Sequence, residues 1–355
     1  MSLTWRASPS PSLGSRRSAA RSLRTGWRRW PALAGCAVGG ICLIWLVRQT
    51  SPSEALASVR RLNWSLVAFA VAADIAAYVI QGWRWSLLLR PVGRTSWVAT
   101  TEAIYVGLFA NEILPLRTGE IVRAYALSRS LQTSVRSIVP SILVERLFDG
   151  IWLGIGVSVT ALLVPLPAHL REASDIFGAA ILIGTCAFVL MMLRSSASPD
   201  TSMAPDPNSS TWVRAAGSAI HDVAVGLHNI GFTRTTLAAA ALSLLFLCSQ
   251  ALAFWLVMRA CGLIMSPWVA AAVLVMVHLG TVVPNAPANV GTFQVFTIIG
   301  LSLFGVERAV ATAFSMVLFL VLTIPLWALG AFAVVRRGLS IETLRRAGES
   351  RSSLY

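Results

Sequence analysis

Hydrophobic residues occur along the chain in nine long runs, separated by more polar stretches. The runs lie at residues 31–47, 64–89, 97–114, 138–164, 175–193, 237–260, 267–283, 291–304 and 308–335. A helix needs about 20 apolar residues to span the hydrocarbon core of a bilayer, and several of these runs are that long. The pattern predicts an all-α, polytopic transmembrane helix bundle.

Polar and helix-breaking residues interrupt two of the apolar stretches. Residues 111–120 break the stretch 97–131, and residues 284–291 break the stretch 267–304. Pro removes a helical hydrogen bond and Gly loosens the backbone, and such breaks at membrane depth persist only inside protein or beside a water-filled cavity. We therefore expect about six full spans and two re-entrant half-helix hairpins, with eight spans as the alternative. Breaks at matching places in two halves also suggest an inverted repeat, although no similarity between individual residues of the halves is evident.

The polar segments predict how the chain is divided. Residues 1–30 are rich in Ser and Arg and are expected to form a disordered cytoplasmic tail. The transmembrane domain is predicted at 31–337, and residues 338–355 form a second cytoplasmic tail. Within the domain, the Pro, Ser and Asp of 195–211 indicate a flexible linker. Residues 213–230 have the apolar spacing of an amphipathic helix, either on the membrane surface or as a plain connection.

Composition and charge agree with a membrane protein. Hydrophobic residues make up 56% of the chain and charged residues 12%, too little polar surface to cover a soluble core of this size. The net charge of +14 comes from Arg alone, because the sequence has no Lys. The Arg residues flank the apolar runs, so they indicate orientation and contact with anionic lipid rather than nucleic acid.

The distribution of Arg also predicts topology. With a cytoplasmic N-terminus, six spans and two hairpins, 22 Arg lie in cytoplasmic segments, 6 lie outside, and Arg146 lies within the membrane. This bias follows the positive-inside rule. It predicts a multi-pass protein of the cell (inner) membrane with both termini in the cytoplasm.

Ionisable side chains within apolar segments are costly and are therefore functional candidates. One cluster surrounds the first break and another lies in the run 138–164; their members are Glu102, Asn111, Glu112, Arg117, Glu120 and Arg123, then Glu145, Arg146 and Asp149. Glu145 and Asp149 are four residues apart and share one helix face, and Arg117, Glu120 and Arg123 follow one another at intervals of three and form a second stripe. The two stripes can pair across a helix interface. Such a network could lock the helices together or hold a lipid phosphate, and the two roles are compatible.

The second break carries no charge. Its candidates are Pro287, Asn289, Gly291 and Gln294, because helix N-termini within such a loop carry partial positive charge and can face an anion. Elsewhere, Asp74 and Arg84 are expected to flank their span, with Arg84 as an interfacial anchor between two Trp residues. No catalytic signature, cofactor motif or metal cluster is found, so we do not expect an enzyme.

These motifs resemble a known family. Asn111-x3-Pro115-x-Arg117-x-Gly119-Glu120-x2-Arg123, followed by Glu145-Arg146-x2-Asp149, is similar to the lysylphosphatidylglycerol synthase transmembrane-region family, and so is Pro284-x2-Pro287 followed by Gly291-x-Phe293. The likeness covers about residues 30–337, but Gln294 stands where the family commonly has an acid. The resemblance implies binding or movement of a lipid, such as an aminoacylated phospholipid, a hopanoid or a polyprenyl-linked sugar. It does not imply lysyl transfer, which belongs to a separate soluble domain.

The sequence therefore predicts a membrane protein that binds and translocates an anionic phospholipid or a lipid-linked molecule. The expected substrate-binding residues are Asn111, Arg117, Glu120, Arg123, Glu145, Arg146, Asp149, Pro287, Asn289, Gly291 and Gln294. One alternative is a membrane transferase with a lipid-linked donor, in which Glu120, Glu145 or Asp149 acts as the base. Another is an accessory subunit of a cell-envelope glycosyl- or aminoacyltransferase.

Overall fold

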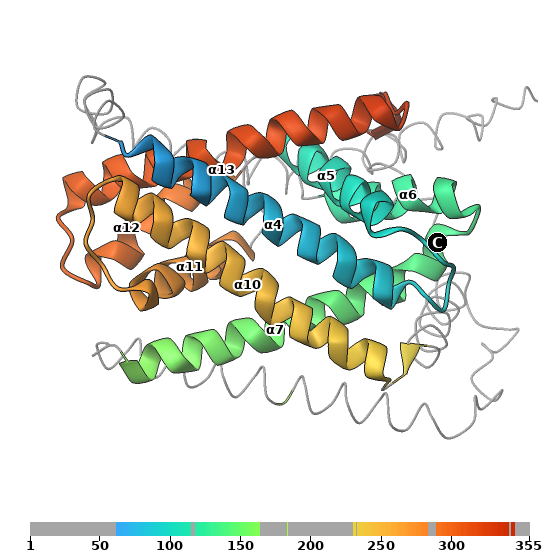
Figure 1. Ribbon diagram of the computed structural model, residues 1–355, viewed down its shortest axis with the longest axis horizontal. Helices are drawn as coiled ribbons and strands as arrows, with labels where there is room; N and C mark the ends of the chain where they lie inside the picture. The colour runs from blue at the N-terminus through green and yellow to red at the C-terminus, as the bar shows by residue number, and fades with distance from the viewer. Residues whose placement is uncertain are drawn as a thin grey trace, which may run out of the picture.

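The computed structural model describes residues 62–114, 118–163, 183, 230–231, 233–282, 289–340 and 342–344. Its helices are α4 (Trp64–Leu88), α5 (Trp97–Ile113), α6 (Gly119–Leu131), α7 (Val135–Leu163), α10 (Arg234–Ala260), α11 (Pro267–Val282), α12 (Thr292–Ser302) and α13 (Arg308–Arg336). Over these ranges the protein is all-helical and contains no strand (Figure 1). The predicted span 31–47, the N-terminal tail and the linker 195–211 lie outside the described residues. So do nearly all of the span 175–193 and of the amphipathic segment 213–230, and most of the C-terminal tail 338–355.

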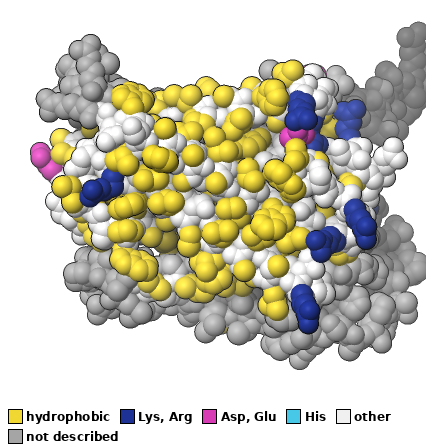
Figure 2. Space-filling view, viewed as in Figure 1, with side chains coloured by type: hydrophobic (Ala, Val, Ile, Leu, Met, Phe, Trp, Pro, Cys, Tyr) yellow, Lys and Arg dark blue, Asp and Glu magenta, His cyan; other side chains and the backbone are white. Residues whose placement is uncertain are grey.

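Three helices, α4, α10 and α13, are long and apolar enough to cross a membrane. On α4, the exposed side chains of Trp64 and Trp83 are 19 residues apart, about 28 Å along the helix. This separation matches the hydrocarbon thickness of roughly 30 Å, and Trp favours the two membrane interfaces. Figure 2 shows the corresponding broad hydrophobic face, with Arg at its two edges. The protein is a helical membrane protein.

Helices α4 and α10 pack against each other as an antiparallel pair at the centre of the bundle (Figure 1). At one end the Asn63 amide donates to the Ala260 carbonyl at 3.1 Å. In the middle the rings of Tyr78 and Phe246 have centroids 6.4 Å apart. These contacts fix which residues of the two helices face each other.

Helices α5 and α6 form a hairpin whose open end lies at the C-terminal end of α13. The Arg337 guanidinium donates to the carbonyls of both Ala99, in the first limb, and Ala126, in the second. The tip of the hairpin lies further along α13, away from this end. The Trp327 indole donates to Glu112 Oε2, near the tip, at 2.8 Å. Since Trp327 precedes Arg337 by ten residues, this tip reaches about 15 Å into the bundle.

The second hairpin, α11 and α12, enters from the opposite end. Phe293, at the start of α12, lies 5.6 Å from Phe319 and 6.3 Å from Phe254 between ring centroids. Phe319 is 11 residues from the first residue of α13, Arg308, so this tip also reaches about 17 Å inward. Measured along α13, the two tips stop eight residues, or roughly 12 Å, short of each other.

The limbs of the first hairpin cross where two glycines meet. A Cβ on Gly107 would lie 2.6 Å from the Gly119 carbonyl oxygen, which is closer than van der Waals contact allows. Near the tip, Asn111 Oδ1 accepts the Gly119 amide at 2.7 Å. Asn111, a predicted substrate residue, thus closes the hairpin by satisfying the first amide of α6.

The two four-helix units, α4–α7 and α10–α13, make matching sets of contacts. α4 packs on α5 as α10 packs on α11, and α5 lies against α13 as α11 lies against α7. The two units also share a short sequence pattern, in contrast to the expectation from the sequence. Arg90-x2-Gly93 before Trp97-Val98-Ala99 corresponds to Arg259-x2-Gly262 before Trp268-Val269-Ala270.

Arg residues of the described ranges are unequally divided between the two ends of the bundle. The end at which the first hairpin opens carries Arg90, Arg94, Arg129, Arg136, Arg234, Arg336 and Arg337, and the other end carries Arg259 and Arg308. Glu102 pairs with Arg336 at 2.8 Å and with Arg337 at 3.3 Å. Glu102 therefore belongs to this basic end and is separate from the charges at the first break.

Candidate functional site: a charge network between four helices

Glu145 of α7 is the centre of a buried charge network. Its side chain is fully buried, and Oε1 accepts hydrogen bonds from Gln81 Nε2 at 2.7 Å and from Arg84 NH2 at 2.6 Å. On its other side, Arg123 NH2 lies 3.1 Å from Oε2. One carboxylate is thus held by two guanidinium groups, from α4 and α6.

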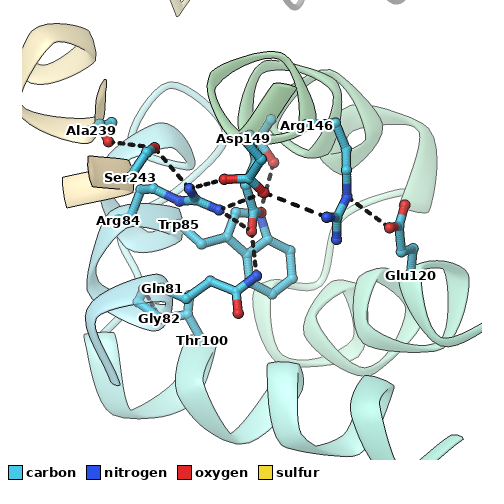
Figure 3. Close-up of polar contacts among 12 residues, drawn as sticks. Gln81, Gly82, Arg84, Trp85, Thr100, Glu120, Arg146, Asp149, Ala239 and Ser243 are labelled. Carbon is cyan, nitrogen blue, oxygen red and sulfur yellow. Dashed lines mark hydrogen bonds and ion pairs between the residues drawn. The ribbon is translucent and has the colours of Figure 1, made fainter. Parts of the chain in front are cut away.

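Arg84 joins three helices. It is fully buried, pairs with Glu145 and Asp149 of α7, and donates to Ser243 Oγ of α10 at 2.8 Å (Figure 3). The interpretation of Arg84 as an interfacial anchor was wrong. Trp83 is the residue that faces outward, half exposed, whereas Arg84 lies about 100° further round the helix and points into the bundle.

The inward face of α4 can be read from its spacing. Buried residues recur every three or four positions, at Ala70, Asp74, Ala77, Gln81, Arg84 and Leu88. Asp74 and Arg84 therefore belong to one internal polar stripe and do not flank the span. We missed this signal because the two Trp residues beside Arg84 favoured an interfacial position.

Trp85 supports the network from the side. Its ring lies 4.8 Å below the Arg123 guanidinium, and its indole donates to Ser141 Oγ at 3.0 Å. A cation over an indole face gains electrostatic stabilisation, most strongly when it is desolvated. Arg123 is 4% exposed, so both its charge and its plane are held in place.

The network opens outward at Arg146. Its Nε lies 2.7 Å from Glu120 Oε1 of α6, and its NH1 lies 3.4 Å from Asp149 Oδ2 (Figure 3). The side chains of Arg146 and Glu120 are 47% and 43% exposed, whereas Asp149 is 18% exposed and also contacts Arg84. Asp149 therefore links the buried part to the exposed part.

The inner and outer parts of the network differ in energy. Removing one partner of a buried pair costs about 3–5 kcal/mol, because a buried charge is left uncompensated. An exposed pair is worth roughly 0–1 kcal/mol. The inner set of Gln81, Arg84, Arg123 and Glu145 thus fixes the helices, and the outer pair of Arg146 and Glu120 can exchange partners.

With the geometry described, comparisons with known proteins can be added. A family model described as the lysylphosphatidylglycerol synthase TM region matches residues 32–330. The chain belongs to this family. The resemblance drawn from the two polar breaks is therefore confirmed.

A curated relative is glycosyltransferase AglD from Haloferax volcanii, which is 29% identical over 137 residues. The match covers 36% of this chain and 22% of the relative. This member of the lysylphosphatidylglycerol synthase TM region family thus spans less than a quarter of that relative's length.

The structure brings five of the predicted residues into the network and leaves others elsewhere. The five are Glu120, Arg123, Glu145, Arg146 and Asp149. The expected pairing between the two helical stripes is seen in the ion pairs that join α6 to α7. Arg117 and Pro287 lie outside the described residues.

The described residues of the second break stabilise the turn to which they themselves belong. Asn289 adopts a left-handed conformation with φ of 53°, and Gln294 Oε1 accepts the Gly291 amide at 2.7 Å. Gln294 is 4% exposed. Among the described residues, no hydrogen bond or ion pair joins this turn to the charge network. This chain thus uses an amide oxygen to cap α12.

Proposed function

We propose that this protein binds an anionic lipid or lipid-linked molecule and moves it across the membrane. Arg146 carries the proposal. It lies at the level of Arg84, within the segment 138–164 that is apolar apart from Glu145, Arg146 and Asp149, and it is half exposed. A charged side chain inside such an apolar segment is by default a candidate for a substrate pathway or a water-filled cavity.

The chemistry of Arg146 suits a phosphate. A guanidinium offers five N–H donors in one plane, and those of Arg146 are directed partly to Glu120 and Asp149. A phosphate oxygen pair matches the same fork in a bidentate manner. Because the pair with Glu120 is half exposed, a head group can replace Glu120 at little cost.

The architecture suggests how a bound head group would move. We interpret both hairpins as re-entrant and the two units as an inverted repeat, an arrangement from which alternating access follows in transporters. The positive-inside rule puts the Arg-rich end in the cytoplasm, so that the α5–α6 hairpin opens to that side. The inner charges would hold α4, α6 and α7 together while the outer pair exchanges.

A reconstitution experiment tests the proposal. Purified protein in vesicles is mixed with phosphatidylglycerol that carries a fluorophore, and movement between leaflets is followed by quenching from outside. Wild-type protein is expected to accelerate the movement over that in empty vesicles, and Arg146→Gln is expected to slow it at least tenfold. Arg129→Gln is the matched control. It removes the same charge, but from a residue that is exposed near the end of α6.

Two results would overturn the proposal. One is that labelled lipids of the anionic and polyprenyl-linked classes all cross no faster with wild-type protein than in empty vesicles. The other is that Arg146→Gln moves lipid at the same rate as Arg129→Gln. Analysis of the lipids that copurify with wild type and with Arg146→Gln identifies the head-group class directly.

A second candidate is a role in glycosyl transfer, as the enzyme or as an accessory subunit, and the partial similarity to glycosyltransferase AglD supports it. Glu145 is a poor base for such chemistry, because it is fully buried and held by two Arg residues. Glu120 and Asp149 are more accessible. Loss of a glycosylated lipid product in Glu120→Gln, with lipid movement unchanged, would favour this candidate over translocation.

A further inference from the structure

A second buried acid lies far from the charge network, at the middle of the membrane. Asp74 is ten residues after Trp64 and nine before Trp83, the two exposed Trp residues of α4, so it lies at the midpoint between the interfaces. Its side chain is 6% exposed. The nearest cation on α4, Arg84, is about 15 Å further along the helix and is already held by Glu145 and Asp149.

The groups that surround Asp74 are polar but uncharged or acidic. Tyr78 contacts Phe246, and one turn further along each antiparallel helix Asp74 comes level with Gln250. Gln250 is 9% exposed, and its Oε1 receives no hydrogen bond. From α5, Tyr105 lies 5.7 Å from Tyr78 between ring centroids, and its buried hydroxyl also has no partner. Asp74 precedes Tyr78 by four residues, so the two side chains lie on the same face of α4.

No cation faces this acid from the described helices that pack against α4. Between their terminal Arg residues, α10 and α13 contain no Asp, Glu, Lys, Arg or His, and α10 adds the thiol of Cys248, which is exposed. α5 contributes Tyr105 and Glu112, and Glu112 accepts from Trp327. The charges of α7 lie at the level of Arg84. In the part of the chain that the structure describes, Asp74 itself makes no hydrogen bond or ion pair.

A proton satisfies this arrangement better than a bare carboxylate does. An ionised acid at the bilayer centre is costly, and a buried carboxyl group without a partner becomes neutral instead. Once protonated, Asp74 has an O–H to donate, and the oxygen of Gln250 is a buried acceptor that lacks a donor. When ionised, it can instead accept the hydroxyl hydrogen of Tyr105.

We infer that Asp74 is a proton-binding site at mid-membrane, and that its protonation sets how the α5–α6 hairpin packs on the α4–α10 pair. Proton binding forms one O–H bond on Asp74, and proton release breaks that bond. When Asp74 is ionised, it accepts a hydrogen bond from Tyr105 and so binds the α5–α6 hairpin. When Asp74 is protonated, it donates a hydrogen bond to Gln250 and so binds α10 instead. Because this inference rests on the proposed lipid movement, it names the proton gradient as the energy source.

The first experiment imposes a pH gradient on the reconstituted vesicles. The gradient is expected to raise the initial rate of lipid movement several-fold in wild type and in Asp74→Glu, which keeps the carboxyl group. Asp74→Asn, a fixed mimic of the neutral acid, is expected to show one rate with and without the gradient. Glu307→Gln, an exposed acid at the start of α13, is the matched control and should respond as wild type does.

The second experiment tests proton binding without transport. Infrared difference spectra of the purified protein in lipid nanodiscs are recorded during a pH titration. Other acids also contribute protonated carboxyl C=O bands, so the variants are compared with wild type band by band. One band that is present in wild type and in Glu307→Gln is expected to be missing in Asp74→Asn. If wild type and Asp74→Asn show the same C=O bands, the proton site is wrong.

The outcomes separate the two proposals. Wild type that moves lipid at a rate indifferent to the pH gradient, or dependent on Na⁺ instead, overturns proton coupling and leaves lipid movement standing. Wild type that moves no lipid overturns the proposed function, and the infrared band then decides the proton site by itself.

Discussion

The two units of the bundle have the same architecture and opposite chemistry. α7 and α13 are both 29 residues long, and pairing them from first to last residue places Leu318 where α7 has Glu145, and Leu322 where it has Asp149. Glu145 and Leu318 are both fully buried. One helical position is thus filled by a carboxylate in the first unit and by a hydrocarbon in the second.

The central pair of helices repeats the contrast. When α4 and α10 are aligned on Arg90 and Arg259, Gln81 corresponds to Gln250, but Arg84 corresponds to Ala253. The second unit therefore folds without the ions that the first unit buries. Because apolar packing in place of a buried ion pair is often neutral or better for stability, we hypothesise that the first unit retains its charges for function.

The largest effect is expected when the buried carboxylate of the first unit alone is replaced by the Leu found at the matching position of the second. Glu145→Leu leaves the guanidiniums of Arg84 and Arg123 without their shared carboxylate, so the free energy of unfolding should fall by about 3–5 kcal/mol. Denaturant titration of the purified protein in detergent measures it. Leu318→Val at the matching position should cost only about 1 kcal/mol. Equal losses of unfolding free energy in the two variants would show that the buried ions do not stabilise the fold.

Converting the three charged residues of the inner set should undo that loss. In a triple variant, Arg84→Met, Arg123→Met and Glu145→Leu, no uncompensated charge remains among these three positions, and stability should return to within about 1 kcal/mol of wild type. Lipid movement in the vesicle assay should nevertheless be abolished. A triple variant that is stable and still moves lipid would refute a functional role for the inner charges.

The crossing of the first hairpin sets a smaller effect. In Gly107→Ala the new methyl group would press on the Gly119 backbone, which cannot yield as a side chain can, so we expect a loss of about 1–3 kcal/mol. The thermal unfolding temperature reports it. Gly150→Ala in α7 is the matched control, since its methyl meets no atom within 4 Å and a helical Gly→Ala change is itself favourable. If both variants unfold alike, the close crossing of α5 and α6 is incorrect.

The smallest effect is expected at the charge-free break. Gln294→Leu removes the acceptor of the Gly291 amide and should cost about 1 kcal/mol, as the loss of a helix cap does. Gln294→Glu keeps an oxygen at this position and should leave the unfolding temperature close to that of wild type. A strong loss of lipid movement in Gln294→Leu with unchanged stability would instead indicate that this residue contacts substrate.

Several features could be predicted from hydrophobic pattern and spacing. The helices α4, α5, α7 and α10–α13 fall on predicted apolar runs, because burial in lipid demands long continuous apolar segments. That the two charged stripes could pair across a helix interface followed from charges repeated at helical spacing. Which residues pair, Arg123 with Glu145 and Glu120 with Arg146, came from the structure. The repeat of Arg-x2-Gly and Trp-Val-Ala was also present in the sequence, but two extra residues in the second unit conceal it from a simple comparison.

Other features required the fold. Sequence spacing places Arg84 on a helix face, but only the packing of α4 against α7 and α10 decided that this face is internal and that Arg84 reaches Glu145, Asp149 and Ser243. Likewise, Asn111 and Gln294 are polar residues at breaks in either view, and their roles as caps depend on where the next amide points.

The sequence by itself determined that the chain resides in a membrane, where its helices run, and which charges are costly enough to need a reason. The tertiary structure decided which of those charges are locked inside and which can meet a ligand. The physical reason is that transfer into lipid depends on each segment's own composition, whereas the state of a buried ion depends on partners from helices distant in sequence. Asp74 and Arg84 lie on one face of one helix, and among the described residues only the second of them has ion-pair partners, Glu145 and Asp149.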